Sequence, residues 1–255
     1  MSFKQRIIIR DDPILLAKLA AEIFVAGARR SVDRKGLFSV AISGGSTPRR
    51  MHQMLAAEPY IHSIPWQNIH IFWVDERCVS QNSSESNYGT AKRDFIDDVP
   101  IPQSHLHWIT CEPSLRKSVK EYQKTLKDVF SFERSRIPRF DLICLGMGAD
   151  GHIASLFPGQ KSLSEKEKLV VAVKGGNPNV NRITMTLPLL NQARHIVFMV
   201  TGEGKAKTVK GVLEDRKIRL PAQKIQPLKG RLTWLMDNGA ACLLSGDLHH
   251  DNVKG

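Results

Sequence analysis

The chain has 255 residues, of which 42% are hydrophobic and 24% are charged, as in ordinary globular proteins. This length is sufficient to bury a substantial core in one large domain. No apolar run reaches about 18 residues, which excludes a membrane-spanning helix, so we expect no membrane partner. The formal net charge is +12, but the basic residues are spread along the chain and alternate with apolar ones. Because such spreading is typical of solvated helix faces, we predict no nucleic-acid partner.

The N-terminus and the cysteines both indicate the cytoplasm. The opening MSFKQRIIIRDD holds only three consecutive isoleucines before charged residues return, unlike a signal peptide. No C-x-x-C pair is present among Cys78, Cys111, Cys144 and Cys242. Cys144 and Cys242 lie in apolar runs, which is typical of reduced, buried thiols rather than of a disulfide framework or a zinc site. We therefore predict a cytoplasmic protein with reduced cysteines and no metal site.

Strand-like and helix-like patterns alternate through most of the chain. Apolar runs predict strands over residues 6–10, 38–42, 69–74, 106–109, 142–145, 169–173, 182–187, 195–200 and 232–236. Helical spacing predicts helices over 13–32, 86–97 and 113–130, helices that begin near 48 and 206, and a last helix over 238–244. This alternation predicts one α/β domain over residues 1–255, with a mostly parallel central sheet flanked by helices on both faces, as in Rossmann-like folds. A loose polar tail is expected over about 247–255.

The first candidate binding loop follows the predicted strand 38–42 and reads Ser43-Gly44-Gly45-Ser46-Thr47-Pro48. Its glycines let the backbone approach a ligand closely, its hydroxyl groups supply donors, and Pro48 begins a helix whose first N–H groups face the loop. A strand, a glycine-serine loop and a helix N-terminus form an anion site that suits a phosphate group. The spacing of a Walker A loop is absent, and an ordinary tight turn with a helix cap is the alternative.

The most informative stretch is 141–159, DLICLGMGADGHIASLFPG, in which a buried strand ends in glycines and is followed by Asp150 and His152. Such side chains lie at the carboxyl edge of the sheet, where open α/β sheets bind ligands, and an imidazole changes charge near neutral pH. The stretch also contains a G-x-G-x-x-G pattern. A dinucleotide site is disfavoured, because Pro158 and Gly159 prevent the required helix and no acidic residue closes the next predicted strand.

Two further strand ends carry charged residues. The strand 69–74 ends in Asp75-Glu76-Arg77, which is either part of a ligand site or an ion pair that neutralises itself in a loop. The strand 195–200 is followed by a glycine turn and by Lys205 at the start of a helix, a position that is also common for an ordinary surface lysine. If the four strand ends converge, they combine an anion cradle, cations, carboxylates and an imidazole. That composition suits general-base hydrolysis or isomerisation of a phosphorylated metabolite.

Five stretches resemble one enzyme family, in the family's order and over nearly the whole chain. They are ISGGSTP, WVDERCV with SNYG following, DLICLGMGADGHIASLFPG, RITMTLPLLNQARHIVFMVTGEGKA and LPAQKIQPLKGRLTWLMD. Together they are similar to the 6-phosphogluconolactonases of the glucosamine/galactosamine-6-phosphate isomerase superfamily. The resemblance implies the fold of that superfamily. It also implies hydrolysis of 6-phospho-D-glucono-1,5-lactone to 6-phospho-D-gluconate in the oxidative pentose phosphate pathway, with no cofactor.

The resemblance assigns roles to the residues singled out above. His152 is the expected base that deprotonates the attacking water, Asp150 orients or tunes that region, and Arg77 stabilises negative charge on the substrate or the tetrahedral oxyanion. Asp75 is counted with this catalytic set. The expected phosphate ligands are Gly44, Gly45, Ser46, Thr47 and Lys205, with Arg182 as a further contact. The partner is then a small phosphosugar lactone, bound by a monomer or small homo-oligomer.

Two other functions are compatible with parts of the sequence. Glucosamine-6-phosphate deaminase shares the DGHIA stretch but continues with Phe-Asn-Glu-Pro, whose glutamate serves its catalytic histidine, and has Asp-Glu-Tyr at the second site. This chain has Ser155-Leu156-Phe157-Pro158 and Asp75-Glu76-Arg77 instead, which favours the lactonase. A non-catalytic sugar-phosphate-binding protein is the other alternative, and the intact Asp-Gly-His triplet disfavours it.

Overall fold

A parallel sheet forms the centre of the molecule. The computed structural model describes residues 4–131, 137–215 and 217–245. Within these residues seven strands form one sheet, in which every neighbouring pair is parallel. In spatial order they are β1 (Lys4–Arg10), β10 (Arg231–Asp237), β9 (His195–Val200), β6 (Leu142–Leu145), β2 (Phe38–Ile42), β3 (Ile69–Trp73) and β5 (Leu106–His107). The predicted mostly parallel sheet is therefore confirmed.

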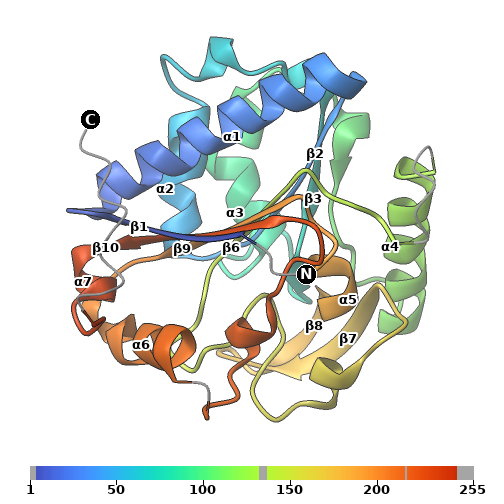
Figure 1. Ribbon diagram of the computed structural model, residues 1–255. Helices are drawn as coiled ribbons and strands as arrows, with labels where there is room; N and C mark the ends of the chain where they lie inside the picture. The colour runs from blue at the N-terminus through green and yellow to red at the C-terminus, as the bar shows by residue number, and fades with distance from the viewer. Residues whose placement is uncertain (1–3, 132–136, 216, 246–255) are drawn as a thin grey trace.

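Helices cover both faces of this sheet. Their bounds are α1 (Pro13–Lys35), α2 (Ser46–Leu55), α3 (Asn87–Asp94), α4 (Leu115–Val129), α5 (Leu187–Leu190), α6 (Ala206–Glu214) and α7 (Asn238–Ala241). Figure 1 shows α1, α2 and α3 on one side of the sheet and α5 and α6 on the other. None of the helices in the described part of the chain has both the length and the apolar character needed to cross a membrane.

The first helix, α1, illustrates how the sequence limits an element. The side chain of Asp12 accepts hydrogen bonds of 2.7 and 2.8 Å from the backbone N–H groups of Ile14 and Leu15, which would otherwise lack a partner. Pro13 follows at a position where no N–H is needed. Gly36 ends the helix in the left-handed conformation, at a φ of 78°. The helix therefore continues about one turn beyond its predicted end.

The chain changes its direction of travel across the sheet between β2 and β6. Although these strands are neighbours, β2 leads through α2 to β3 on one side, whereas β6 leads towards β9 on the other. Such a switch point leaves a crevice at the carboxyl ends of the strands, where α/β proteins bind ligands. The loop 43–48 follows β2 and the loop 146–152 follows β6, so two of the predicted site segments meet at this crevice.

A second, antiparallel sheet was not predicted. In spatial order it contains β4 (Asp75–Arg77), β8 (Val180–Met185) and β7 (Val170–Gly175). Residues 75–77 were predicted only as the polar end of the strand 69–74, but they form a strand of their own in which Arg77 lies opposite Arg182. Three residues are too few to show a strand periodicity, so only the fold reveals this pairing.

The prediction of reduced cysteines is wrong for one pair. Cys78 and Cys111 form a disulfide, with their Cα atoms 5.3 Å apart. Cys78 follows β4 and Cys111 follows β5, so the fold, and not a spacing in the sequence, brings them together. Cys144 is free and buried, as predicted, whereas Cys242 is free but exposed.

The last predicted helix is shorter than expected. Asp237 caps α7 as predicted, because its side chain accepts a hydrogen bond of 2.7 Å from the backbone N–H of Ala240. The helix then ends at Ala241 instead of continuing to residue 244. The predicted tail over 247–255 lies outside the described residues.

Candidate active site

The four predicted strand-end segments line one cavity of about 180 Å³ at the switch point. The predicted site residues in its wall are Gly44, Gly45, Ser46, Thr47, Asp75, Arg77, His152, Arg182 and Lys205. Asp150 is not in the wall but contacts the His152 side chain. The structure therefore brings together all of the residues predicted for the site, from segments that follow or belong to β2, β4, β6, β8 and β9.

The loop after β2 presents the free N–H groups of α2. Gly45 is the N-cap residue of α2 and has no side chain that could accept a hydrogen bond from the first turn. Its φ of 104° lies in the left-handed region that favours glycine. Gly44 packs closely against Asn87, because a Cβ atom at Gly44 would lie 2.0 Å from Oδ1 of Asn87. An anion can therefore approach the backbone and the hydroxyl groups of Ser46 and Thr47.

His152 is anchored by Asp150. The Oδ1 atom of Asp150 lies 2.5 Å from Nδ1 of His152 and accepts a hydrogen bond of 3.1 Å from the His152 backbone N–H. Burial acts to raise the pKa of Asp150, but these hydrogen bonds and the nearby imidazole outweigh it and lower the pKa below its ordinary value. With Nδ1 engaged by a carboxylate, Nε2 is the ring nitrogen that a ligand can reach.

Two neighbours restrict the position of the His152 ring. A Cβ atom at Gly148 would lie 2.1 Å from Nδ1 of His152 and 2.7 Å from Oδ1 of Asp150, so the pair needs glycine at this position. On another side, the centre of the Phe157 ring lies 4.9 Å from the centre of the His152 ring. Phe157 also lies against Arg182, whose guanidinium carbon is 5.5 Å from the ring centre.

Two arginines of the antiparallel sheet share one register position. Arg77 on β4 pairs with Arg182 on β8, and both line the cavity. Arg182 is buried and donates hydrogen bonds of 2.8 and 3.1 Å to the carbonyl oxygens of Gly175 and Pro178. Burial lowers the pKa of Arg182, and the charge of Arg77 lowers it further. Because like charges at opposite positions of a sheet repel, an anion in contact with both arginines would be stabilised.

Asp75 is a buried carboxyl group that lines the same cavity as these arginines. Its Oδ2 atom accepts a hydrogen bond of 2.5 Å from the Ser155 hydroxyl, and Oδ1 accepts a longer one of 3.4 Å from Asn87. Burial raises the pKa of Asp75, while the hydrogen bond from Ser155 and the charge of Arg182 act against this rise. Asn87 in turn accepts a hydrogen bond of 3.1 Å from Arg77. Asp75 and Asn87 thereby hold Arg77 in place.

Asn87, Ser155 and Glu76 belong to the site but were not predicted from the sequence as site residues. Both carboxyl oxygens of Glu76 are used at the start of α3, where they accept hydrogen bonds of 2.8 and 2.7 Å from the backbone N–H groups of Asn87 and Tyr88. Burial raises the pKa of Glu76 to about 7, although these hydrogen bonds favour its charged form. The available signal for Asn87 was its place in the SNYG motif that follows WVDERCV.

Lys205 reaches the cavity from the start of α6. It is the last residue of the short 3-10 helix η6 (Glu203–Lys205) and the N-cap residue of α6. The turn before it is fixed by Asp237, whose two carboxyl oxygens each lie 3.0 Å from the backbone nitrogen of Gly202, which donates to them. Burial lowers the pKa of Lys205, and the charge of Asp237 acts against this shift.

The site therefore combines a helix N-terminus, three cations and a histidine-carboxylate pair around one small cavity. A helix N-terminus and cations bind a phosphate group, and a histidine held by a carboxylate can act as a general base. Within the described ranges, no group of three or more histidine, cysteine, aspartate or glutamate side chains is arranged to hold a metal ion.

Comparisons with known proteins agree with this geometry. A family model described as glucosamine-6-phosphate isomerases/6-phosphogluconolactonase matches residues 11–234. The chain is 36% identical over 249 residues to probable 6-phosphogluconolactonase 3, chloroplastic, of Oryza sativa subsp. indica. The alignment covers 94% of this chain and 76% of that protein. It is 35% identical over 236 residues to 6-phosphogluconolactonase 3, chloroplastic, of Arabidopsis thaliana, at 90% and 71% coverage. The solved structure of 6-phosphogluconolactonase from Trypanosoma brucei matches with a TM-score of 0.85 and 26% identity, over 96% of this chain and 100% of that one.

Proposed function

Because the chain belongs to the family of glucosamine-6-phosphate isomerases and 6-phosphogluconolactonases, we propose that it hydrolyses 6-phospho-D-glucono-1,5-lactone to 6-phospho-D-gluconate. This reaction is a step of the oxidative pentose phosphate pathway. The observation that carries the proposal is that His152, held by Asp150, lines the same cavity as the glycine-serine loop at the start of α2. A lactone is already reactive, so one base and a well-placed substrate are sufficient, and the proposed reaction uses no cofactor.

In the proposed mechanism, Nε2 of His152 takes a proton from a water molecule whose oxygen attacks C1 of the lactone. The contact between Nδ1 and Asp150 orients the ring and stabilises the imidazolium that forms. Arg77 stabilises the negative charge that develops on the carbonyl oxygen. The tetrahedral intermediate then breaks the bond from C1 to the ring oxygen, which takes up a proton and becomes a hydroxyl group.

The remaining residues of the cavity hold the substrate. We assign the 6-phosphate to the N–H and hydroxyl groups of Gly44, Gly45, Ser46 and Thr47, with Lys205 and Arg182 as cationic contacts. Asp75 is then a positioning residue, since it reaches Arg77 through Asn87. This assignment places the phosphate at the start of α2 and the reacting carbonyl near His152.

Phe157 favours lactone hydrolysis over deamination. In the deaminase motif compared above, a glutamate that serves the catalytic histidine stands where this chain has Phe157. The Phe157 ring lies 4.9 Å from the His152 ring, centre to centre, so an apolar group occupies the space where that carboxylate is needed. Asp150 is the carboxylate that is hydrogen-bonded to the His152 ring in the described part of the chain.

The test compares the decay of freshly generated 6-phosphogluconolactone with wild-type protein, with H152A and with H62A, at about pH 6.5. H62A is the matched control, since the His62 side chain is 78% exposed. We expect H152A to lower turnover by about 10²–10⁴-fold, the usual share of a general base, and H62A to leave it unchanged. A loss of less than about tenfold would reject His152 as the base. Ammonia release from glucosamine 6-phosphate, or binding of 6-phosphogluconate without lactone decay, would replace the proposed reaction by one of the two alternatives.

Three broader expectations are also proposed for this chain. Residues 1–255 form one domain, the protein is a monomer or small homo-oligomer, and it acts in the cytoplasm. The two plant relatives described above are chloroplastic, so cell fractionation with antibodies against this chain is the test of its compartment. Light scattering coupled to size-exclusion chromatography measures the oligomeric state.

A further inference from the structure

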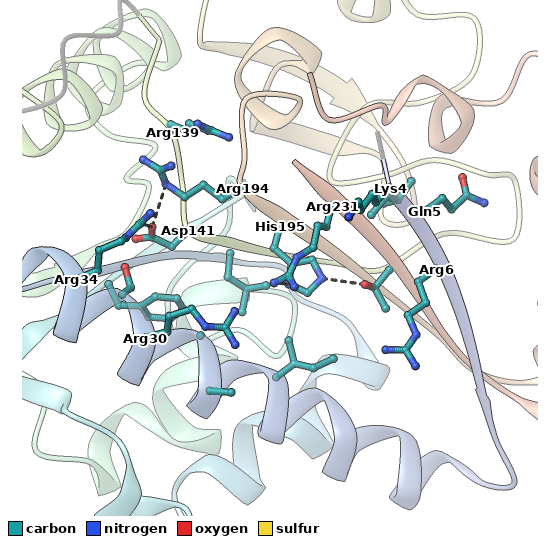
Figure 2. A pocket seen from close by; sticks show the side chains of 18 of the residues that line it. Lys4, Gln5, Arg6, Arg30, Arg34, Arg139, Asp141, Arg194, His195 and Arg231 are labelled. Atoms are coloured by element: carbon teal, nitrogen blue, oxygen red, sulfur yellow. Dashed lines mark hydrogen bonds and ion pairs between the residues drawn. The ribbon is translucent and has the colours of Figure 1, made fainter. Parts of the chain in front are cut away.

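A second cavity, of about 780 Å³, lies at the other edge of the parallel sheet. Its walls are the C-terminal half of α1 and the amino ends of β1, β10 and β9, together with residues just before β6 and β9 (Figure 2). It shares no lining residue with the candidate active site. Because the amino and carboxyl ends of parallel strands lie at opposite edges of a sheet, a ligand in this cavity would not contact the catalytic residues. We call it the amino-edge cavity.

Positive charge dominates the amino-edge cavity. Of the residues that the structure describes, seven lysine and arginine side chains line it, and Asp141 is the one lining residue with a carboxyl group. The charge of Asp141 is already shared by close cations, since its carboxyl oxygens lie 2.9 Å from Nζ of Lys35 and 3.3 Å from Nε of Arg194. Lys4, Arg30 and Arg231 make no ion pair among the described residues, so their positive charge would stabilise a bound anion carrying several negative charges.

Several of these polar groups lie side by side where three strands begin. Lys4 on β1 pairs with Arg231 on β10, which pairs with His195 on β9. Nη2 of Arg231 lies 3.3 Å from Nδ1 of His195, and Nε2 of His195 lies 2.9 Å from the hydroxyl of Thr233. A guanidinium can only donate, so Nδ1 accepts and the hydrogen of Nε2 is donated to Thr233. The imidazole is therefore neutral and adds no charge to the cavity.

Arg30 of α1 faces this row from the other side of the cavity, as Figure 2 shows. Burial, together with the charges of Arg231 and Arg30, lowers the pKa of His195 to about 4, which agrees with the neutral ring. Neither Arg30 nor Arg231 has a carboxylate within ion-pair distance among the described residues. Lys4 and Arg231 lie at opposite positions of neighbouring strands, so an anion in contact with both would relieve their repulsion.

The inner wall of the amino-edge cavity is apolar. Ile8, Phe38, Leu142 and Leu232 line it and are all buried. A ligand that matches both parts of the wall combines several negative charges with an apolar or aromatic group. A cavity of this size suits a small organic ligand. We propose that the amino-edge cavity binds an organic polyphosphate such as a nucleoside di- or triphosphate, with its phosphates on Lys4, Arg30 and Arg231 and its organic part on the apolar wall.

The test measures binding of ATP and of inorganic tripolyphosphate by isothermal titration calorimetry in magnesium-free buffer. The variant R30Q/R231Q removes two cations of the cavity, and the control R116Q/K120Q removes two exposed cations from α4. We expect R30Q/R231Q to weaken both ligands by about tenfold or more, because charge-assisted contacts to phosphate are strong. The control is expected to bind as the wild type does. Lactone hydrolysis by R30Q/R231Q is expected to be unchanged, which also shows that the variant is folded.

ATP is expected to bind more tightly than tripolyphosphate, because its adenosine group can cover the apolar wall. Equal affinity for the two ligands would overturn the organic part of the proposal, and no binding by the wild type would overturn all of it. An equal loss of affinity in both variants would also overturn the proposal, because it indicates a general charge effect. Displacement of ATP by 6-phosphogluconate would overturn it as well, because it places ATP in the candidate active site. Tighter binding of single-stranded DNA than of ATP at one salt concentration would replace the polyphosphate by a nucleic acid.

Discussion

Replacement of Gly148 by alanine tests the His152–Asp150 pair with a single added methyl group. The new Cβ atom would lie 2.1 Å from Nδ1 and 2.2 Å from Cε1 of His152, and 2.7 Å from Oδ1 of Asp150. Ordinary contacts between such atoms are about 3.5–4.0 Å, so the ring and the carboxylate cannot keep their positions. The φ of Gly148 is not among the positive values in the described chain, so the effect comes from the contact and not from the backbone.

The expected effect on catalysis follows from the size of this displacement. Restoring contact distances requires a shift of His152 by about 1 Å or more. A misplacement of about 1 Å at a reacting group costs about 10²-fold in rate. We therefore expect G148A to lower kcat by about 10²-fold, with a KM for the lactone within about threefold of the wild type, because the phosphate loop after β2 is untouched.

The assay is the decay of 6-phosphogluconolactone at about pH 6.5, followed at several lactone concentrations. G204A is the matched control, because a Cβ atom at Gly204 meets no heavy atom within 4 Å. Thermal unfolding of both variants shows that they are folded. A kcat for G148A within about threefold of the wild type would refute the view that the His152–Asp150 contact positions the base.

Three further predictions concern other parts of the structure. R77Q should lower kcat by about 10²-fold in the lactone assay, as loss of an oxyanion donor does, and an unchanged kcat contradicts its proposed role. Reduction of the Cys78–Cys111 disulfide, whose partners are 33 residues apart, should lower the free energy of unfolding in urea by about 3–4 kcal/mol. His52 is buried, which lowers its pKa to about 4, so from about pH 6.5 down to 4 only the unfolded chain binds its proton. Between pH 7 and 5 the free energy of unfolding should therefore fall by about 2 kcal/mol less in H52L than in the wild type.

The sequence was sufficient to predict the elements and segments that depend on local patterns. The strands β2 and β9 have the predicted bounds, because each is a mostly apolar run that ends at a polar residue followed by glycine, Ser43-Gly44 after β2 and Thr201-Gly202 after β9. The site segments were predictable for the same reason. Polar residues directly after a buried parallel strand lie at its carboxyl edge, and these edges meet, so the loops after β2 and β6 converge.

The features that the sequence did not predict depend on pairings between distant segments. Arg77 lies opposite Arg182 because a three-residue strand joins a second sheet, and no local pattern marks so short a strand. The hydrogen bond from Ser155 to Asp75 depends on the same packing. The disulfide of Cys78 depends on the relative positions of β4 and β5. Spacing along the chain carries no information about these contacts.

The net charge of +12 shows why a sum over the chain says little about its partners. On α4, two of the lysines form ion pairs with acidic residues one turn away, Lys117–Glu121 at 3.7 Å and Lys124–Asp128 at 2.5 Å. In the amino-edge cavity, in contrast, Lys4, Arg30 and Arg231 make no ion pair with a carboxylate of the described residues. Positive charge that serves only solubility has no reason to gather around a cavity whose inner wall is apolar. The concentration of the charge, rather than its total, is therefore what indicates a bound anion.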